Sequence, residues 1–239
     1  MNLKIYTIAT IILIAGTIVF LIFNHIRTIN IGAQVQAQGV NINDNVTVKY
    51  KYHLNGKVKV KNEITKDPKS GKNIRNIFTQ YDIHGLVTDQ EESSYDIKTG
   101  IRTKIIDIKY DENEKILQKN EFNYDPNNGN MTSKTQAQYY QNGNLSYFIE
   151  WNYIPDSNVP TFCINTNYNR EGNITSKEEI KYNTMTGHKI SSNYMQYESN
   201  GNIYHKEERK YAFETGEVTS TTITKFDSKG NITEKEEYK

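Results

Sequence analysis

Aromatic residues recur every 29 positions along most of the chain. The series is Tyr52, Tyr81, Tyr110, Tyr139, Tyr168, Tyr197 and Phe226. Four residues after each aromatic stands a glycine, with Glu114 as the exception, and many of these glycines follow an asparagine, as in Asn55-Gly56. Six residues after each aromatic stands an aliphatic residue, the first being Val58. This spacing is typical of two strands joined by a hairpin turn.

A second series lies 14 residues into each unit and has a turn of its own. It consists of Lys66, Tyr95, Tyr124, Tyr153, Tyr182 and Tyr211. A glycine follows five residues later, replaced once by Asn158. Each 29-residue unit therefore predicts two strands and two turns, and residues 52–226 predict thirteen turns and about fourteen strands. The expected fold class is all-β, an elongated antiparallel meander in which each hairpin contacts only its neighbours.

The apolar residues are too few for a conventional two-layer sandwich. They form stripes near the turns, while the middle of each strand is largely polar. Fourteen strands at a spacing of about 4.8 Å make a sheet on the order of 65 Å long. Because open twisted sheets seldom reach this size, we expect a single layer that coils along its length or a rolled sheet.

Glutamate recurs once in every unit on the face opposite the aliphatic stripe. The row is Glu63, Glu92, Glu121, Glu150, Glu179, Glu208 and Glu237. Lysine stands two residues earlier in most units, whereas Gln90 and Phe148 replace it in two. The row is either a set of carboxylates that hold cations or a basic partner, or a solvated face of Lys–Glu pairs that prevents sheets from stacking.

The middle units are more apolar than the rest, and residues of both faces contribute. The candidate partner-binding residues are Tyr139, Tyr147, Phe148, Trp151, Tyr153 and Phe162. Either the sheet bends here and buries both faces as a local core, or the patch is exposed and binds a partner. Cys163 lies in this stretch with no histidine or basic cluster beside it, which predicts a buried thiol and not a reactive one.

The N-terminal segment predicts a membrane anchor. Residues 5–23 contain no charge over about the length of a membrane-spanning helix, and Lys4 precedes them. A signal anchor over residues 1–23 is the favoured interpretation, and a cleaved signal peptide is the alternative. Residues 24–45 are expected to be a linker and residues 46–239 the β-hairpin repeat domain. The repeat domain is then membrane-anchored and extracytoplasmic, on the cell surface or in the periplasm, or secreted if the segment is cleaved.

Several classes of function are disfavoured by the composition. The 29 basic and 28 acidic residues balance, which argues against a nucleic-acid-binding protein. The five histidines form no metal-ligand spacing, and no phosphate-binding or nucleophile motif is present. Neighbouring acidic residues such as Glu178 and Glu179 point to opposite faces of a strand, so one strand cannot supply an acid–base pair. We expect no catalytic residue, no metal and no cofactor.

The repeat units resemble two known families. Segments such as 197–203 (YESNGNI) and 226–232 (FDSKGNI) look like YD-type (Rhs-like) repeats and like the MORN-variant repeats of bacterial antitoxin-type proteins. The tandem pattern covers about residues 46–239. The resemblance implies β-hairpin arrays used for shielding, wrapping or partner binding, and it implies no catalytic residue.

These observations favour a non-enzymatic bacterial repeat protein that offers its sheet as a binding or scaffolding surface. The N-terminal helix would attach it to the membrane, and the partner would be a protein or a glycan. Two alternatives stay open. One is an antitoxin or immunity-type protein that binds a toxin through the aromatic middle units. The other is a binder of cell-wall carbohydrate, in which tyrosine rings stack on sugars.

Overall fold

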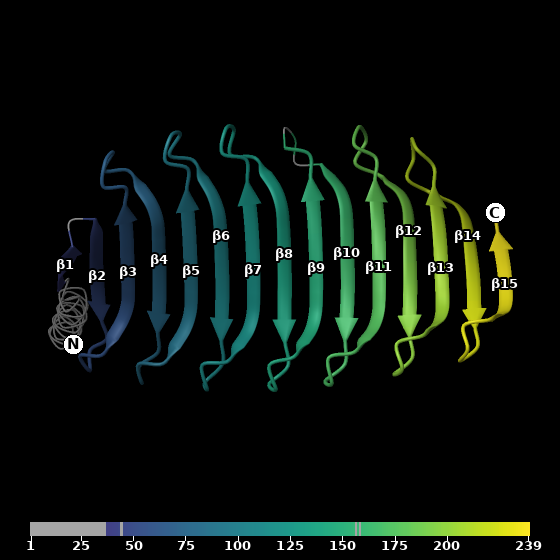
Figure 1. Cartoon of the computed structure of the whole chain (residues 1–239), viewed down its shortest axis with the longest axis horizontal. Coiled ribbons are helices and arrows are strands. Elements are labelled where there is room, and N and C mark those ends of the chain that lie inside the picture. Colours follow the sequence, from purple (N-terminus) through teal and green to yellow (C-terminus); the bar gives the residue numbers. More distant parts are fainter. Residues whose placement is uncertain (1–36, 44, 156, 158) are drawn as a thin grey trace, which may run out of the picture.

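The protein is one antiparallel sheet of fifteen strands in the part of the chain that the computed structural model describes, residues 37–43, 45–155, 157 and 159–239. The strands are β1 Ala37–Asn43, β2 Val46–Tyr52, β3 Val58–Lys66, β4 Asn73–Tyr81, β5 Val87–Tyr95, β6 Arg102–Tyr110, β7 Ile116–Tyr124, β8 Met131–Tyr139, β9 Leu145–Tyr153, β10 Pro160–Tyr168, β11 Ile174–Tyr182, β12 Lys189–Tyr197, β13 Ile203–Tyr211, β14 Val218–Phe226 and β15 Ile232–Tyr238. Their order in the sheet follows the sequence (Figure 1). The all-β meander is confirmed, and the predicted strands are β2 to β15.

Two kinds of turn alternate along the chain and lie at opposite ends of the strands (Figure 1). In the short turns, such as 82–86, the first residue's N–H donates to the carbonyl of the last, here Asp82 to Leu86 at 2.9 Å. In the long turns, such as 96–101, Asp96 N–H likewise donates to Ile101 at 2.8 Å. The glycine lies in the left-handed region in both, with φ of 91° at Gly85 and 75° at Gly100. Glycine adopts this conformation without the Cβ clash of other residues, which explains its periodic placement.

One short turn forms without glycine. Glu114 takes the same backbone conformation, with φ of 57°. Its Oε1 accepts a hydrogen bond from the backbone N–H of Val87, in the preceding unit, at 3.1 Å. This contact offsets part of the cost of the left-handed conformation. Asn158, the other predicted replacement for glycine, lies outside the described residues.

Side chains of one turn donate hydrogen bonds to the backbone of the next turn at the same end of the strands. On the short-turn side, Asn55 Nδ2 donates to the Ile83 carbonyl at 2.8 Å and Asn142 Nδ2 donates to the Arg170 carbonyl at 2.7 Å. On the long-turn side, Thr99 Oγ1 donates to the Pro126 carbonyl at 2.9 Å. These hydrogen bonds join neighbouring units at the ends of the strands, in addition to the hydrogen bonds between the strands.

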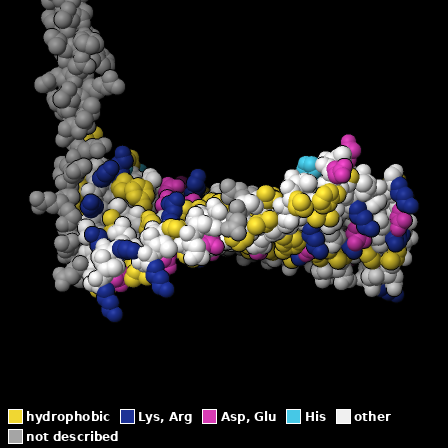
Figure 2. All heavy atoms as spheres, turned by 90° about the horizontal axis from the view of Figure 1, so that it is seen from above, with side chains coloured by type: hydrophobic (Ala, Val, Ile, Leu, Met, Phe, Trp, Pro, Cys, Tyr) yellow, Lys and Arg dark blue, Asp and Glu magenta, His cyan; other side chains and the backbone are white. Residues whose placement is uncertain are grey.

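The sheet is a single open layer. Only consecutive strands contact each other, and β1 and β15 lie at opposite ends of the array (Figure 1). Of the two expected forms, the structure has the open one and not the rolled one. Seen from above, the molecule is an elongated slab that narrows in its middle (Figure 2). Both broad faces of the sheet therefore lack a second layer within the described residues.

Small side chains make up most of what is buried. One row comprises Thr79, Ala137, Thr166, Met195 and Thr224, and a row on the opposite face comprises Ser93, Cys163, Ile180 and Ser192. In a single layer, only neighbours on the same face can cover a residue, so short side chains between longer ones are the ones that become buried. The aliphatic stripe is half-buried at most positions, but Ile174 and Ile232 are exposed.

The sheet begins earlier than the repeat. β1 lies within residues 24–45, the segment predicted as a linker, and pairs with β2 in an irregular register. β1 is therefore a fifteenth strand beyond the fourteen predicted. The predicted anchor and residues 24–36 lie outside the described residues. Within the described part of the chain, no helix has the length and apolar character needed to cross a membrane.

Candidate interaction surface

The two faces of the sheet differ in their chemistry. The face that carries the seven-membered glutamate row, including Glu150, is called the glutamate face below, and the face that carries Trp151 is called the tryptophan face. Successive strand residues alternate between the two faces, and directly paired residues share a face except at the register shifts beside the turns. Trp151 pairs with Cys163, whereas Glu150 pairs with Ile164, which places these two residue pairs on opposite faces.

The structure divides the predicted partner-binding residues between the two faces. Tyr147, Trp151 and Tyr153 lie on the tryptophan face by alternation along β9. Phe148 and Phe162 lie on the glutamate face, because Phe162 pairs with Asn152. Tyr139, at the end of β8, lies on the glutamate face as well. The six residues therefore cannot contact one flat partner together, and each face has its own aromatic set.

Among the described residues, no strand other than its two neighbours contacts β9, so they show no bend that buries both faces. All nine residues of β9 are half-buried. In Figure 2, hydrophobic side chains lie along the slab among charged ones, both toward the left end and from the middle to the right. The local-core interpretation of this stretch is therefore wrong in its geometry. The sheet stays regular here, and the apolar side chains remain partly open to solvent.

Cys163 is buried on the tryptophan face, as predicted, with a relative exposure of 1%. Burial, together with the nearby Glu178 carboxylate, raises the pKa of its thiol to about 11. The Trp151 and Tyr182 rings approach to 6.0 Å between centroids, tilted by 33°. Burial also raises the pKa of Tyr182 to about 12. These side chains form a compact aromatic cluster without a reactive thiol.

A hollow lies on the tryptophan face of β11 to β13. It has a volume of about 230 Å³ and is lined by Glu178, Ser192, Tyr194, Glu207 and Arg209. The hollow contains two carboxylates, those of Glu178 and Glu207. Arg209 Nε donates to Glu207 Oε1 at 2.6 Å, so Glu207 is already paired. The hollow is smaller than the roughly 300–1,000 Å³ of typical small-molecule sites.

Ion pairs run across the glutamate face. In four units the glutamate pairs with the lysine two residues earlier, at 2.8 Å for Lys61–Glu63 and 2.6 Å for Lys177–Glu179. In two units it pairs across strands instead, and Arg75 binds Glu92 through two hydrogen bonds of 2.7 and 2.8 Å. Hydrogen bonding to Arg75 lowers the pKa of Glu92. The solvated ion-pair interpretation of this row therefore holds for six of its seven members.

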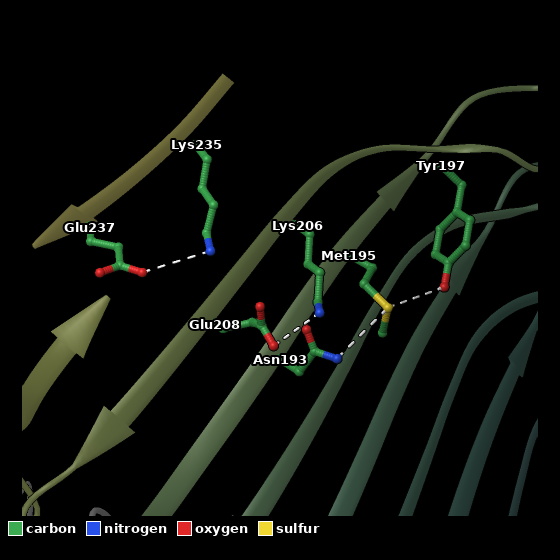
Figure 3. A network of polar contacts seen from close by, with 7 residues as sticks. All are labelled: Asn193, Met195, Tyr197, Lys206, Glu208, Lys235 and Glu237. Atoms are coloured by element: carbon green, nitrogen blue, oxygen red, sulfur yellow. Dashed lines mark hydrogen bonds and ion pairs between the residues drawn. The ribbon is translucent and has the colours of Figure 1, made fainter. Parts of the chain in front are cut away.

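Figure 3 shows how the glutamate face is built near the C-terminal end. The Lys206–Glu208 and Lys235–Glu237 pairs lie on β13 and β15, at 2.9 and 3.8 Å. Met195 lies further along the same face, and its sulfur accepts weak hydrogen bonds from Asn193 Nδ2 and Tyr197 OH at 3.9 and 3.7 Å. The Tyr197 ring, which begins its repeat, thus lies over the buried Met195 on its own strand.

The remaining titratable side chains of the described residues form no cluster that could hold a metal ion. Nowhere in the described ranges do three or more His, Cys, Asp or Glu side chains come together as metal ligands. His53 is engaged in a turn, where its Nε2 lies 3.0 Å from the Tyr81 carbonyl oxygen. The arrangement offers extended surfaces with repeated chemistry, and the middle strands β8 to β10 depart most from the repeat.

Comparison with known proteins leaves the family open. No protein-family model matches the chain. No curated protein is significantly similar to it in sequence. The resemblance to YD-type and MORN-variant repeats therefore stays a prediction.

Three solved structures are similar to this chain at low identity and low TM-score. A TcdB2–TccC3–TEV structure is 11% identical over 82% of this chain, with a TM-score of 0.21, and this chain spans 14% of that one. A porin-like protein from Bacteroides uniformis is 13% identical over 83% of this chain and 91% of its own, with a TM-score of 0.24. A protein of unknown function from Bacteroides fragilis is 12% identical, covers 76% and 93% of the two chains, and has a TM-score of 0.14. Values this low establish no shared family and no shared function.

Proposed function

We propose that this chain is a non-enzymatic repeat protein that offers its sheet as a binding or scaffolding surface outside the cytoplasm. The observation that carries the proposal is the open single layer, in which only consecutive strands contact each other. A sheet of this kind exposes far more surface than a compact domain of equal length. Extended repeat arrays commonly use such surfaces to bind partners.

The middle strands are the proposed binding region. Elsewhere on the glutamate face, ion pairs and small residues repeat from unit to unit. In β9 and β10, Phe148 and Phe162 occupy positions that are charged in other units, such as those of Lys206 and Arg75. Aromatic residues are enriched at protein interfaces, whereas lysine and glutamate are depleted there. A protein partner that binds this region is the first candidate, and a toxin is one form that it could take.

The absence of catalysis is part of the proposal. Six of the seven glutamates of the glutamate face form ion pairs, and the hollow on the tryptophan face is smaller than typical small-molecule sites. Enzymes concentrate perturbed acids, bases and nucleophiles in one cleft. Cys163, the thiol of the aromatic cluster, has a raised pKa and is therefore a poor nucleophile at neutral pH.

The location is proposed from the sequence. The uncharged segment at residues 5–23 would anchor the chain in the membrane, with the sheet outside the cytoplasm. If that segment is cleaved, the sheet would be secreted. No cofactor and no nucleic acid enters this proposal.

A second candidate function is carbohydrate binding on the tryptophan face. Tyr95, Tyr124, Tyr153, Tyr182 and Tyr211 lie near the long turns, one in each unit, and all are half-buried. Their spacing of two strands, about 9.6 Å, would let several rings meet successive sugars of one chain. This candidate predicts binding spread over many units, whereas a protein partner at β8 to β10 predicts binding in one place.

Site-specific photo-crosslinking in the cells that make the protein tests the proposal. A photoreactive phenylalanine analogue would be placed at Tyr147 on one face or at Phe148 on the other. Matched controls are His205 and Lys206, which occupy the same repeat positions two units later. The proposal expects a discrete protein adduct at Tyr147 or Phe148 and none at the controls. A lack of adducts at all four positions would contradict a binding surface in the middle strands. Adducts with glycan at all the tryptophan-face positions would favour the second candidate.

A further inference from the structure

Glu150 differs from every other member of the glutamate row. The other six glutamates each form an ion pair with lysine or arginine, at 2.6 to 3.8 Å. For Glu150, the contact within the described part of the chain is a hydrogen bond of 3.3 Å, which its Oε1 accepts from Asn152 Nδ2. Its carboxylate therefore has a neutral neighbour where the equivalent carboxylates have a cation.

The repeat shows where that cation would stand. In four units it lies two residues before the glutamate, as in Lys177–Glu179. In two units it lies seventeen residues before the glutamate, on the preceding strand, as in Lys104–Glu121. Around Glu150 these two positions are Phe148 and Ser133. Both ways of supplying a cation from within the chain are absent at this unit.

No other position next to Glu150 supplies a charge. The eight nearest positions on its face are Ser133, Thr135, Ala137, Phe148, Asn152, Phe162, Ile164 and Thr166, from β8, β9 and β10. All eight are uncharged, and two phenylalanines, an isoleucine and an alanine make half of them apolar. Glu150 is half-buried among them. A carboxylate in less water interacts more strongly with an incoming cation than one on an open surface.

We infer that Glu150 and its apolar neighbours bind a lysine or arginine side chain of a protein partner, one that presents apolar residues beside the basic one. The incoming cation would occupy the place that the chain's own lysine or arginine occupies in the other six units. Its aliphatic stem would lie along Phe148 or Phe162, which also allows a cation–π contact. Charge complementarity selects this partner over a neutral glycan, which has no cation to offer.

This inference rests on the proposed binding function, and one pair of variants tests it separately. Phe148→Lys restores the residue that five of the seven units carry, so the chain would pair Glu150 by itself. Glu150→Gln removes the charge and keeps the shape. The matched control is Gln90→Lys, which adds the same charge at the same repeat position of a unit whose Glu92 is already paired with Arg75.

The probe is a displayed library of random peptides, selected on the detergent-solubilised full chain. We expect the enriched peptides to carry lysine or arginine between apolar residues. Their binding to Phe148→Lys and to Glu150→Gln should be at least tenfold weaker than to the parent protein, and their binding to Gln90→Lys should be unchanged. Circular dichroism would verify that each variant keeps its sheet. If Glu150→Gln fails to fold, Phe148→Lys decides, because its lysine is normal for the repeat.

Three results would overturn the inference. They are the absence of any enriched peptide, enrichment without basic residues, and equal binding to the parent and to Phe148→Lys. Photo-crosslinking distinguishes a failure of the Glu150 inference from a failure of the proposed binding function. A protein adduct at Tyr147 alone would keep the binding function and move it to the tryptophan face, away from Glu150.

Discussion

Glu91 on β5 lies directly opposite Asp107 on β6, and both side chains point to the tryptophan face. Burial, and then the charge of Glu91, raises the pKa of Asp107, while Arg102 and Lys109 act in the opposite direction. Like charges directly opposite each other destabilise a sheet. A group with a raised pKa in the folded state costs stability once it is ionised, and the cost disappears as the pH falls through that raised pKa.

Replacing Asp107 with asparagine should therefore stabilise the protein at neutral pH, by about 0.2–1 kcal/mol. Urea unfolding at pH 7 measures the gain, and the gain should shrink as the pH falls toward the ordinary carboxyl pKa. Asp89→Asn is the matched control, because Asp89 lies directly opposite Lys109 and should lose a favourable pair. An equal gain in both variants would show that the opposed charges are not the cause.

The aspartates that begin several turns should make the protein sensitive to acid. Backbone hydrogen bonds to their side chains lower the pKa of Asp67, Asp82 and Asp96, and hydrogen bonding to Asn231 does so for Asp227. Because their folded-state pKa is lowered, the stability they add is present above the ordinary value of 3.8 and is lost as the pH falls through the lowered values.

Asp96→Asn should weaken this acid dependence and keep the turn. The amide oxygen can still accept from the backbone N–H groups of Lys98 and Thr99, as the Asn183 side chain does for Met185 and Thr186. Urea midpoints measured from pH 7 to pH 3 would reveal a flatter curve for the variant. Asp96→Ala serves as the control and should destabilise the protein at every pH. A parent protein whose midpoint does not fall in acid would contradict the assignment.

Two turn glycines should respond differently to alanine. Gly201 has φ of 87°, and an added Cβ would meet nothing within 4 Å, so Gly201→Ala should cost about 1 kcal/mol from backbone strain alone. Gly216 has φ of 73°, but a Cβ there would lie 3.2 Å from His188 Cγ. Gly216→Ala should therefore destabilise more, and the excess should shrink in a His188→Ala background, which removes the ring but keeps the His188 Cβ at 3.3 Å. Thermal unfolding compares the parent protein, the three single variants and the double variant, and equal losses at both glycines would count against the contact.

Cys163 should resist alkylation in the folded protein. With a pKa of about 11 against a reference of 9.0, its thiolate population at pH 8 is about a hundredfold lower than that of an ordinary cysteine. Its burial slows the reagent further. Iodoacetamide labelling followed by mass spectrometry should show slow modification in buffer and rapid modification in urea. Rapid labelling without denaturant would indicate that the aromatic cluster around Cys163 opens readily.

Removing one 29-residue unit should leave a folded, shorter protein. Deletion of residues 174–202 joins the short turn that ends at Asn173 to β13, at the same position in the repeat. Since only consecutive strands contact each other, no distant contact is lost. Cooperative unfolding with a smaller denaturant dependence is expected, because the m-value follows the surface exposed. Loss of the sheet after this deletion would indicate coupling between distant units.

Strand limits and turns could be predicted from the sequence because each is marked locally. Every described turn glycine has a positive φ, and the strands begin at the aliphatic residue or at its counterpart after the long turn. The residue that forms an ion pair with each glutamate was harder to predict from the sequence. Glu92 binds Arg75 from the preceding strand, a choice that depends on which residues the register places side by side.

In the candidate site too, some features could be predicted from local sequence, and others depend on contacts between strands. Alternation placed Phe148 and Trp151 on opposite faces, and the absence of lysine at position 148 was visible in the repeat. The sequence pattern could not show that small residues such as Thr166 become the buried ones, because their burial depends on neighbours from adjacent strands. β1 escaped prediction because its segment carries none of the repeat's marks.

The strictly sequential pairing of the strands also determines how the molecule would respond to tension. A pull between β1 and β15 acts across the strands, along the hydrogen bonds, so the load falls on one strand boundary after another. Strands would then peel off singly at low force, and each 29-residue unit would release about 100 Å of extended chain. A protein tethered by its N-terminal end would lengthen in steps under load and could reform each hairpin once the load is removed.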